Sequence, residues 1–138
     1  MPIRPALRGL YPFDWRELSR SIRFRRAGGR CEACSRPNGA TVATIGSAWL
    51  DTDMGVWRDH RGRRTTLPLA PEVARLTRIV IACCHVDHDP THNTGRNLRA
   101  LCGGCHLAHD REHHLQQRRI TYRSRRAVGD LFQGSYRA

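Results

Sequence analysis

The chain has 138 residues, with 24 basic and 12 acidic side chains and a formal net charge of +12 at pH 7. This length supports one modest hydrophobic core, which excludes two independently folded domains. No stretch approaches the roughly 20 apolar residues of a membrane span, and the N-terminus lacks the apolar stretch of a secretory signal. We therefore expect a cytoplasmic protein with no membrane role.

All 24 basic residues are arginine, since the sequence contains no lysine. The guanidinium group binds phosphate oxygens through two parallel hydrogen bonds, and a surface of this charge attracts polyanions. GC-rich codon usage is an alternative cause of the missing lysine, although it does not explain the excess of positive charge. The composition therefore predicts a nucleic-acid partner.

The N-terminal part of the chain predicts a helix followed by a tight turn. An amphipathic helix is expected over residues 13–27, because apolar side chains recur there at helical spacing, at Trp15, Leu18 and Ile22. Two consecutive glycines end it. Residues 31–39 are rich in turn-forming residues around a pair of cysteines.

The middle of the chain predicts β structure. Residues 40–50 suggest a strand, and residues 56–67 suggest a hairpin with its turn near Gly62. The proline-rich stretch 68–72 is expected to be a loop. Residues 76–84 are apolar and β-branched, which makes them the best strand candidate in the chain.

The last third predicts a polar loop, a helix and a basic tail. Residues 87–97 consist of Asp, His, Pro, Thr, Asn, Gly and Arg, most of which are typical of loops. A helix is expected to begin near Cys102 and to continue to about Ile120. Residues 119–138 form a tail with further arginines.

Two cysteine pairs have the same two-residue gap: Cys31 with Cys34, and Cys102 with Cys105. A Cys-x-x-Cys turn directs both sulfurs at one tetrahedral ion, and two such turns fill all four positions. A site without an open position is structural rather than catalytic, so the pattern predicts structural Zn²⁺. Buried free thiols or a redox pair are the alternative interpretation.

The order of these motifs resembles the zinc-ribbon branch of the HNH nuclease family. After the first cysteine pair come His85-Val86-Asp87-His88-Asp89-Pro90, then Asn97-Leu98, then Leu101-Cys102 and Cys105-His106. The resemblance implies an α+β fold with a ββα-metal (His-Me finger) core held together by the four-cysteine structural zinc, an N-terminal helix and an inserted β-hairpin. It implies one nuclease domain over residues 1–138, divided into a lead-in helix (1–30), a first zinc knuckle (31–39), a β insert (40–76), the core (77–118) and a basic tail (119–138).

The resemblance also implies roles for single residues. His85 is expected to be the general base, Asn97 to orient the base or the metal, and His106 to bind a divalent catalytic ion (Mg²⁺, Mn²⁺, Ni²⁺ or Zn²⁺). The family commonly has an acidic or histidine ligand where this chain has Cys84, so Asp87 is expected to supply the missing oxygen.

Structural roles for the same residues remain open. His85 and Cys84 could be core side chains, His106 could support the knuckle through a hydrogen bond, and Asn97 could cap a turn. Asn93 is the second candidate for the asparagine role. We interpret His88 and His92 mainly as solvated loop residues.

Arginine clusters flank the expected site. Phosphate contacts are expected from Arg61, Arg63 and Arg64 on the insert, and from Arg118, Arg119, Arg123, Arg125 and Arg126 beyond the helix. The expected function is a DNA endonuclease or nickase encoded by a bacterium, phage or mobile element, acting as a monomer or homodimer. The alternatives are a zinc-stabilised nucleic-acid-binding module with weak or no catalysis, and an interaction protein of a larger protein complex.

Overall fold

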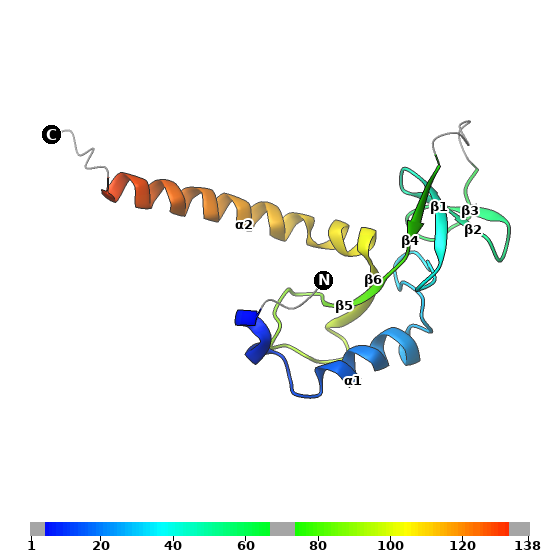
Figure 1. The fold of residues 1–138 in the computed structure, drawn as a ribbon, viewed down its shortest axis with the longest axis horizontal. Helices are drawn as coiled ribbons and strands as arrows, with labels where there is room; N and C mark the ends of the chain where they lie inside the picture. Colours follow the sequence, from blue (N-terminus) through cyan, green and yellow to red (C-terminus); the bar gives the residue numbers. More distant parts are fainter. Residues whose placement is uncertain (1–4, 67–73, 133–138) are drawn as a thin grey trace. The chain divides into compact units, whose positions relative to one another are not determined.

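The computed structural model describes residues 5–66 and 74–132 (Figure 1). Its contacts divide the chain into two units, Met1–Leu107 and Ala108–Ala138, which are treated separately below. The expected α+β class is confirmed, because helices combine with two antiparallel sheets. The expected loop at 68–72 and the end of the basic tail lie outside the described residues, and the single-domain organisation stays a prediction.

The N-terminal helix forms as the apolar spacing predicts. A 3₁₀ segment, η1 (Pro5–Leu10), precedes α1 (Trp15–Arg20), which continues directly into the π-helical turn η2 (Ser21–Arg26). Trp15 and Leu18 pack against the buried core, and Ile22 belongs to it. Gly28 and Gly29 have φ values of 58° and 70°, so the chain leaves the helix in the left-handed region that glycine adopts readily.

The insert is a four-stranded antiparallel sheet rather than a strand and a separate hairpin. Its strands β1 (Thr41–Ile45), β2 (Ala48–Asp51), β3 (Val56–Arg58) and β4 (Arg75–Arg78) lie in the order β3-β2-β1-β4. The single strand expected over 40–50 is wrong, because Gly46 turns the chain with φ 57° and β1 pairs with β2. The expected turn near Gly62 is present. The strand before it, β3, pairs with β2, and the residues after the turn contact β3 through a single antiparallel bridge between Arg58 and Arg64.

The strand expected over 76–84 is divided between two sheets. β4 pairs with β1, whereas β5 (Ile81–His85) pairs with β6 (Leu98–Cys102) in a second, two-stranded sheet. The backbone changes partners at Ile79, which exchanges hydrogen bonds with Gly39 and Ala40. The β6 strand was not expected, because no element was predicted between Asn97 and the helix that was expected to begin near Cys102.

Helix α2 (Gly103–Phe132) follows β6 without a loop. It continues well past Ile120, so the part of the expected tail up to Phe132 is helical, and its exposed surface is rich in arginine. Among the described residues, no helix is both long and apolar enough to cross a membrane.

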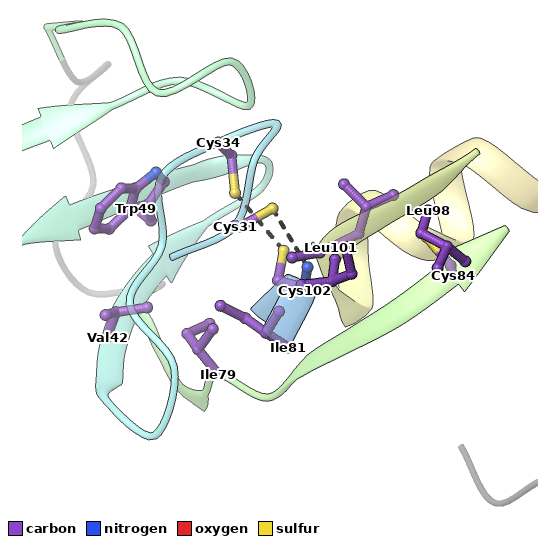
Figure 2. Close-up of a cluster of buried hydrophobic side chains, with 12 residues drawn as sticks. Cys31, Cys34, Val42, Trp49, Ile79, Ile81, Cys84, Leu98, Leu101 and Cys102 are labelled. Carbon is purple, nitrogen blue, oxygen red and sulfur yellow. Dashed lines mark hydrogen bonds between the residues drawn. The ribbon is translucent and has the colours of Figure 1, made fainter. Parts of the chain in front are cut away.

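The hydrophobic core joins the two sheets around the cysteines (Figure 2). Trp49 and Val42 come from the insert sheet, and both are almost completely buried. Ile81 and Leu98 come from the β5–β6 pair, and η2 contacts both of these strands. The two cysteine pairs therefore lie where the helical segment η2, the insert sheet and the β5–β6 sheet meet.

Candidate functional site

Four cysteines from distant parts of the sequence form one compact group. Cys31 and Cys34 come from the turn before β1, Cys102 ends β6, and Cys105 lies in the first turn of α2. Their sulfur atoms all lie within 4.8 Å of one another, and Sγ of Cys34 is 3.6 Å from Sγ of Cys102. A tetrahedral ion with zinc–sulfur bonds of about 2.3 Å requires sulfurs about 3.8 Å apart. The group can hold a structural metal ion such as zinc. Figure 2 shows Cys31, Cys34 and Cys102 of this group.

Local backbone geometry builds the first knuckle. Ser35 has φ 63°, a left-handed conformation that returns the chain beneath Cys31, and the N–H of Ser35 donates to the carbonyl of Cys31 at 2.8 Å. Glu32 then attaches this turn to β6: its N–H donates to the carbonyl of Ala100 at 2.9 Å, and its carboxylate accepts the Ala100 N–H at 2.7 Å. These bonds bring the first cysteine pair against the second.

The four thiol groups shift one another's pKa values in opposite directions. Hydrogen bonds from Cys105 and Cys31 lower the pKa of Cys102 far below its usual range, and the pKa of Cys105 is raised because its thiol donates to Cys102. The backbone N–H of Cys102 also donates to Sγ of Cys31 at 3.3 Å. A divalent cation would replace the thiol protons and allow all four groups to ionise.

The remaining two cysteines do not belong to this group. Cys84 is buried at 5% exposure, and its thiol donates to the carbonyl of Arg99 at 3.3 Å. Cys83 is half-buried, and burial raises the pKa of its thiol to about 11. The structure therefore places Cys84 in the core, which is the alternative role that the sequence left open.

His85 is the last residue of β5, and one of its two ring nitrogens is hydrogen-bonded to a neighbouring side chain. Its Nε2 lies 2.9 Å from Oδ1 of Asn93. The Asn93 amide group donates to the carbonyls of Pro90 and Thr91, so its oxygen faces the imidazole and accepts from Nε2–H. This tautomer leaves the lone pair on Nδ1, which has no hydrogen-bond partner among the described residues.

Two aromatic rings fix the orientation of the same imidazole. Trp15 stacks on His85 with ring centroids 5.2 Å apart and planes 12° apart, and Tyr11 meets it edge-on at 5.7 Å. His85 is 8% exposed as a result. The apolar spacing of the first helix identified Trp15 only as a packing residue, and nothing in the sequence connected Tyr11 or Trp15 with His85.

Asn97 holds the loop between β5 and β6 in place. Its side chain is buried, accepts the N–H of Asp87 at 3.2 Å, and donates to the Asp87 carboxylate and the carbonyl of His92, both at 2.8 Å. The sequence analysis expected one asparagine, Asn97, to orient the base or the metal. In the structure Asn93 contacts the imidazole, whereas Asn97 fixes the loop.

Asp87 and His106, the two expected ligands of a catalytic ion, come from different elements. The Asp87 carboxylate accepts hydrogen bonds from Asn97 and from the Asp89 N–H, and its other oxygen lies 2.6 Å from Nδ1 of His92. These bonds, that from Asn97 first, hold the pKa of Asp87 well below its usual range. His106 lies half-buried in the first turn of α2.

Neither Asp87 nor His106 belongs to a group of three or more metal ligands among the described residues of the first unit. Over the described residues 5–66 and 74–107, the cysteine group is the one set of three or more His, Cys, Asp or Glu side chains with ligand atoms this close together. His88, which we interpreted as a solvated loop residue, has φ 63°. A left-handed conformation in a residue other than glycine is more common at functional sites, and no sequence pattern indicated it here.

The arginines expected to contact phosphate lie at the surface. In the insert, the Arg63 guanidinium pairs with the Asp59 carboxylate at 3.0 Å, while Arg61 contributes a backbone N–H to the same carboxylate. On α2 the exposed arginines are Arg118, Arg119, Arg123, Arg125 and Arg126. Each set is therefore exposed to solvent on its own unit.

Comparison with known proteins adds no relative from which a function could be transferred. No protein-family model, curated protein or solved structure matches this chain. The resemblance to HNH nucleases therefore rests on the motif residues and their order, and the function has to be argued from the site itself.

Proposed function

We propose that this protein is a metal-dependent nuclease that hydrolyses phosphodiester bonds of DNA, with His85 as the general base. The observation that carries the proposal is the fixed tautomer of this residue: Nε2–H donates to Asn93, so Nδ1 holds a lone pair. A neutral imidazole oriented in this way can accept a proton from water near pH 7. The resulting hydroxide attacks phosphorus, and the bond to the leaving 3′ oxygen breaks.

The surroundings of His85 support a positioned base. Trp15 and Asn93 together fix the plane and the rotation of the ring, so the proton acceptor does not have to be oriented during the reaction. The chain order of β5, β6 and α2, with His85 at the end of the first strand, is the order that a ββα-metal core requires.

A divalent cation would supply charge neutralisation at the phosphate and at the leaving oxygen. Asp87 and His106 are its candidate ligands by the resemblance. Asp87 offers an ionised carboxylate held by the loop, since Asn97 and Asp89 fix one of its oxygens. His106 offers an imidazole nitrogen in the turn that carries Cys105.

The charge of the chain supports DNA as the substrate. A net charge of +12 and two arginine sets at the surface favour contacts with the phosphate backbone. Such contacts carry little sequence information, so binding should weaken steeply with salt and depend weakly on sequence.

A plasmid-nicking assay tests the proposal. Supercoiled DNA is incubated with wild-type protein and Mg²⁺, Mn²⁺, Ni²⁺ or Zn²⁺, and with His85→Ala and His60→Ala variants. Loss of the base should reduce cutting by roughly 10²–10⁴-fold, whereas His60, an exposed residue of the insert turn, should be dispensable. Equal cutting by wild type and His85→Ala would remove His85 from the mechanism.

Asn93 gives a second test. Asn93→Ala frees Nε2, so both tautomers become accessible and the fraction with the lone pair on Nδ1 falls. We expect a lower kcat with unchanged DNA binding. An unchanged kcat would show that Asn93 does not orient the base.

A nucleic-acid-binding module without catalysis is the second candidate. It is favoured by the 8% exposure of His85 and by the hydrogen bonds that already occupy the Asp87 carboxylate. This function predicts salt-sensitive DNA binding with no strand breaks under any of the four metals. A role in a larger protein complex predicts instead a protein assembly that survives salt sufficient to remove DNA.

A further inference from the structure

Arg36 follows the first cysteine pair and is buried beside the sulfurs. Its residue exposure is 8%, and its Nη1 lies 3.7 Å from Sγ of Cys34 and 3.9 Å from Sγ of Cys102. Nη2 donates to the carbonyl of Ser47 at 2.9 Å, and the guanidinium lies 5.8 Å from the ring centroid of Trp49. Two elements outside the knuckle therefore fix this guanidinium in position.

The positive charge of Arg36 has no carboxylate partner among the described residues. The ion pairs of those residues involve other arginines, and its Nε is buried without a hydrogen-bond partner. Buried charges in proteins are normally paired, because removal from water is costly. The groups that can carry a compensating negative charge at this position are the cysteine sulfurs.

We infer that Arg36 is the counter-ion of a metal centre formed by four thiolates. Four ionised cysteines and one divalent cation have a net negative charge, which the guanidinium partly neutralises. Nη1 bridges Cys34 and Cys102, whose sulfur atoms lie 3.6 Å apart. The role of Arg36 does not depend on nuclease activity, because it concerns the site that holds the fold together.

The geometry also explains why the residue is an arginine. The planar guanidinium contacts two sulfurs with one nitrogen and the carbonyl of Ser47 with the other. A lysine ammonium at this position would keep the charge but could not maintain both contacts in a fixed plane. The positive charge of Arg36 favours the ionised form of the sulfurs over the protonated form, so it should strengthen retention of the ion. Its N–H donors also withdraw electron density from sulfur and should make the thiolates less nucleophilic.

Metal competition on the full-length protein tests the inference. The apparent Zn²⁺ affinity and the rate of Zn²⁺ release to a chromophoric chelator are measured for wild type, Arg36→Met, Arg36→Lys and Arg30→Met. Arg30 is the matched control, because it lies beside the same knuckle but bonds to Ser35 and Asp53 rather than to sulfur. Arg36→Met should lower the affinity by roughly 10–100-fold, with Arg36→Lys intermediate. The inference would be overturned if Arg36→Met bound Zn²⁺ as tightly as wild type, or if Arg30→Met lost as much Zn²⁺ affinity as Arg36→Met.

Cobalt spectroscopy separates an electronic role from a packing role. With Co²⁺ in place of zinc, the thiolate-to-metal charge-transfer band should move to lower energy in Arg36→Met, which removes the charge and the N–H donors. The shift should be smaller in Arg36→Lys, which keeps the charge and much of the volume. Arg30→Met should leave the band where it is in wild type. An unshifted band in Arg36→Met, or a wild-type spectrum without four-thiolate absorption, would contradict the inference.

Discussion

The turn of the insert lies directly against the first cysteine knuckle, and Gly62→Ala tests this contact. Gly62 has φ 78°, and an added Cβ would lie 3.0 Å from the carbonyl oxygen of Cys34 and 3.4 Å from Oγ of Ser35. The turn has little freedom to retreat, because Gly62 also donates to the carbonyl of Asp59 and accepts from Arg58, both at 3.0 Å. The substitution should therefore displace backbone next to a metal ligand.

The expected loss of stability has two parts. A side chain in the left-handed region costs about 1–2 kcal/mol. The close approach to Cys34 adds about 1–3 kcal/mol, the usual range for overpacking. Gly46→Ala isolates the first part, since Gly46 has φ 57° and its added Cβ would meet nothing within 4 Å. We expect Gly62→Ala to lose about 1–3 kcal/mol more than Gly46→Ala.

Denaturant unfolding of the zinc-loaded protein measures this difference. Both variants are compared with wild type in guanidinium chloride, in the presence of excess Zn²⁺ so that the ion stays bound. Equal destabilisation by the two substitutions in the loaded protein would refute the proposed coupling between insert and knuckle.

Three further outcomes follow from the site. Asn97→Ala removes three hydrogen bonds from a buried side chain and should cost roughly 2–4 kcal/mol in denaturant unfolding, so a loss below about 1 kcal/mol would show that the loop does not depend on it. The pKa of Asp87 is lowered in the folded state, so its ionised form stabilises the protein fully above about pH 4 and progressively less as the pH falls. Asp87→Asn should therefore destabilise the protein at neutral pH, with the difference from wild type shrinking in acid; a constant difference across a pH series of unfolding curves would argue against this linkage. Cys84→Ala should keep one zinc per chain by elemental analysis, whereas Cys102→Ser should lose the metal and the fold. Retained zinc and an unchanged melting temperature in Cys102→Ser would contradict the cysteine site.

Features encoded over a few residues could be predicted from the sequence. The spacing within each cysteine pair determines that both sulfurs of a turn face the same point, and the two turns do form one group. The apolar repeat at Trp15 and Ile22 likewise predicts the first helix, because helical periodicity is local. The loop at 87–97 follows from its turn-forming residues.

Strand boundaries in the middle of the chain depended on partners far away. Residues 76–84 form one largely apolar and β-branched stretch, yet they divide at Ile79 because its backbone pairs with Gly39 and Ala40. Strand β6 was missed for a similar reason: its five residues become a strand by pairing with β5. Such pairings are selected by tertiary contacts, and short apolar runs do not specify them.

The sequence by itself determined which chemical groups are present: four thiols at metal-binding spacing, a histidine at a strand end, asparagines in the following loop and an excess of arginine. Only the tertiary structure decided how these groups are paired. It placed Asn93 and Trp15 on His85, and Arg36 on the sulfurs of Cys34 and Cys102. The physical reason is that spacing along the chain controls contacts within a turn, whereas contacts across tens of residues depend on how the core packs.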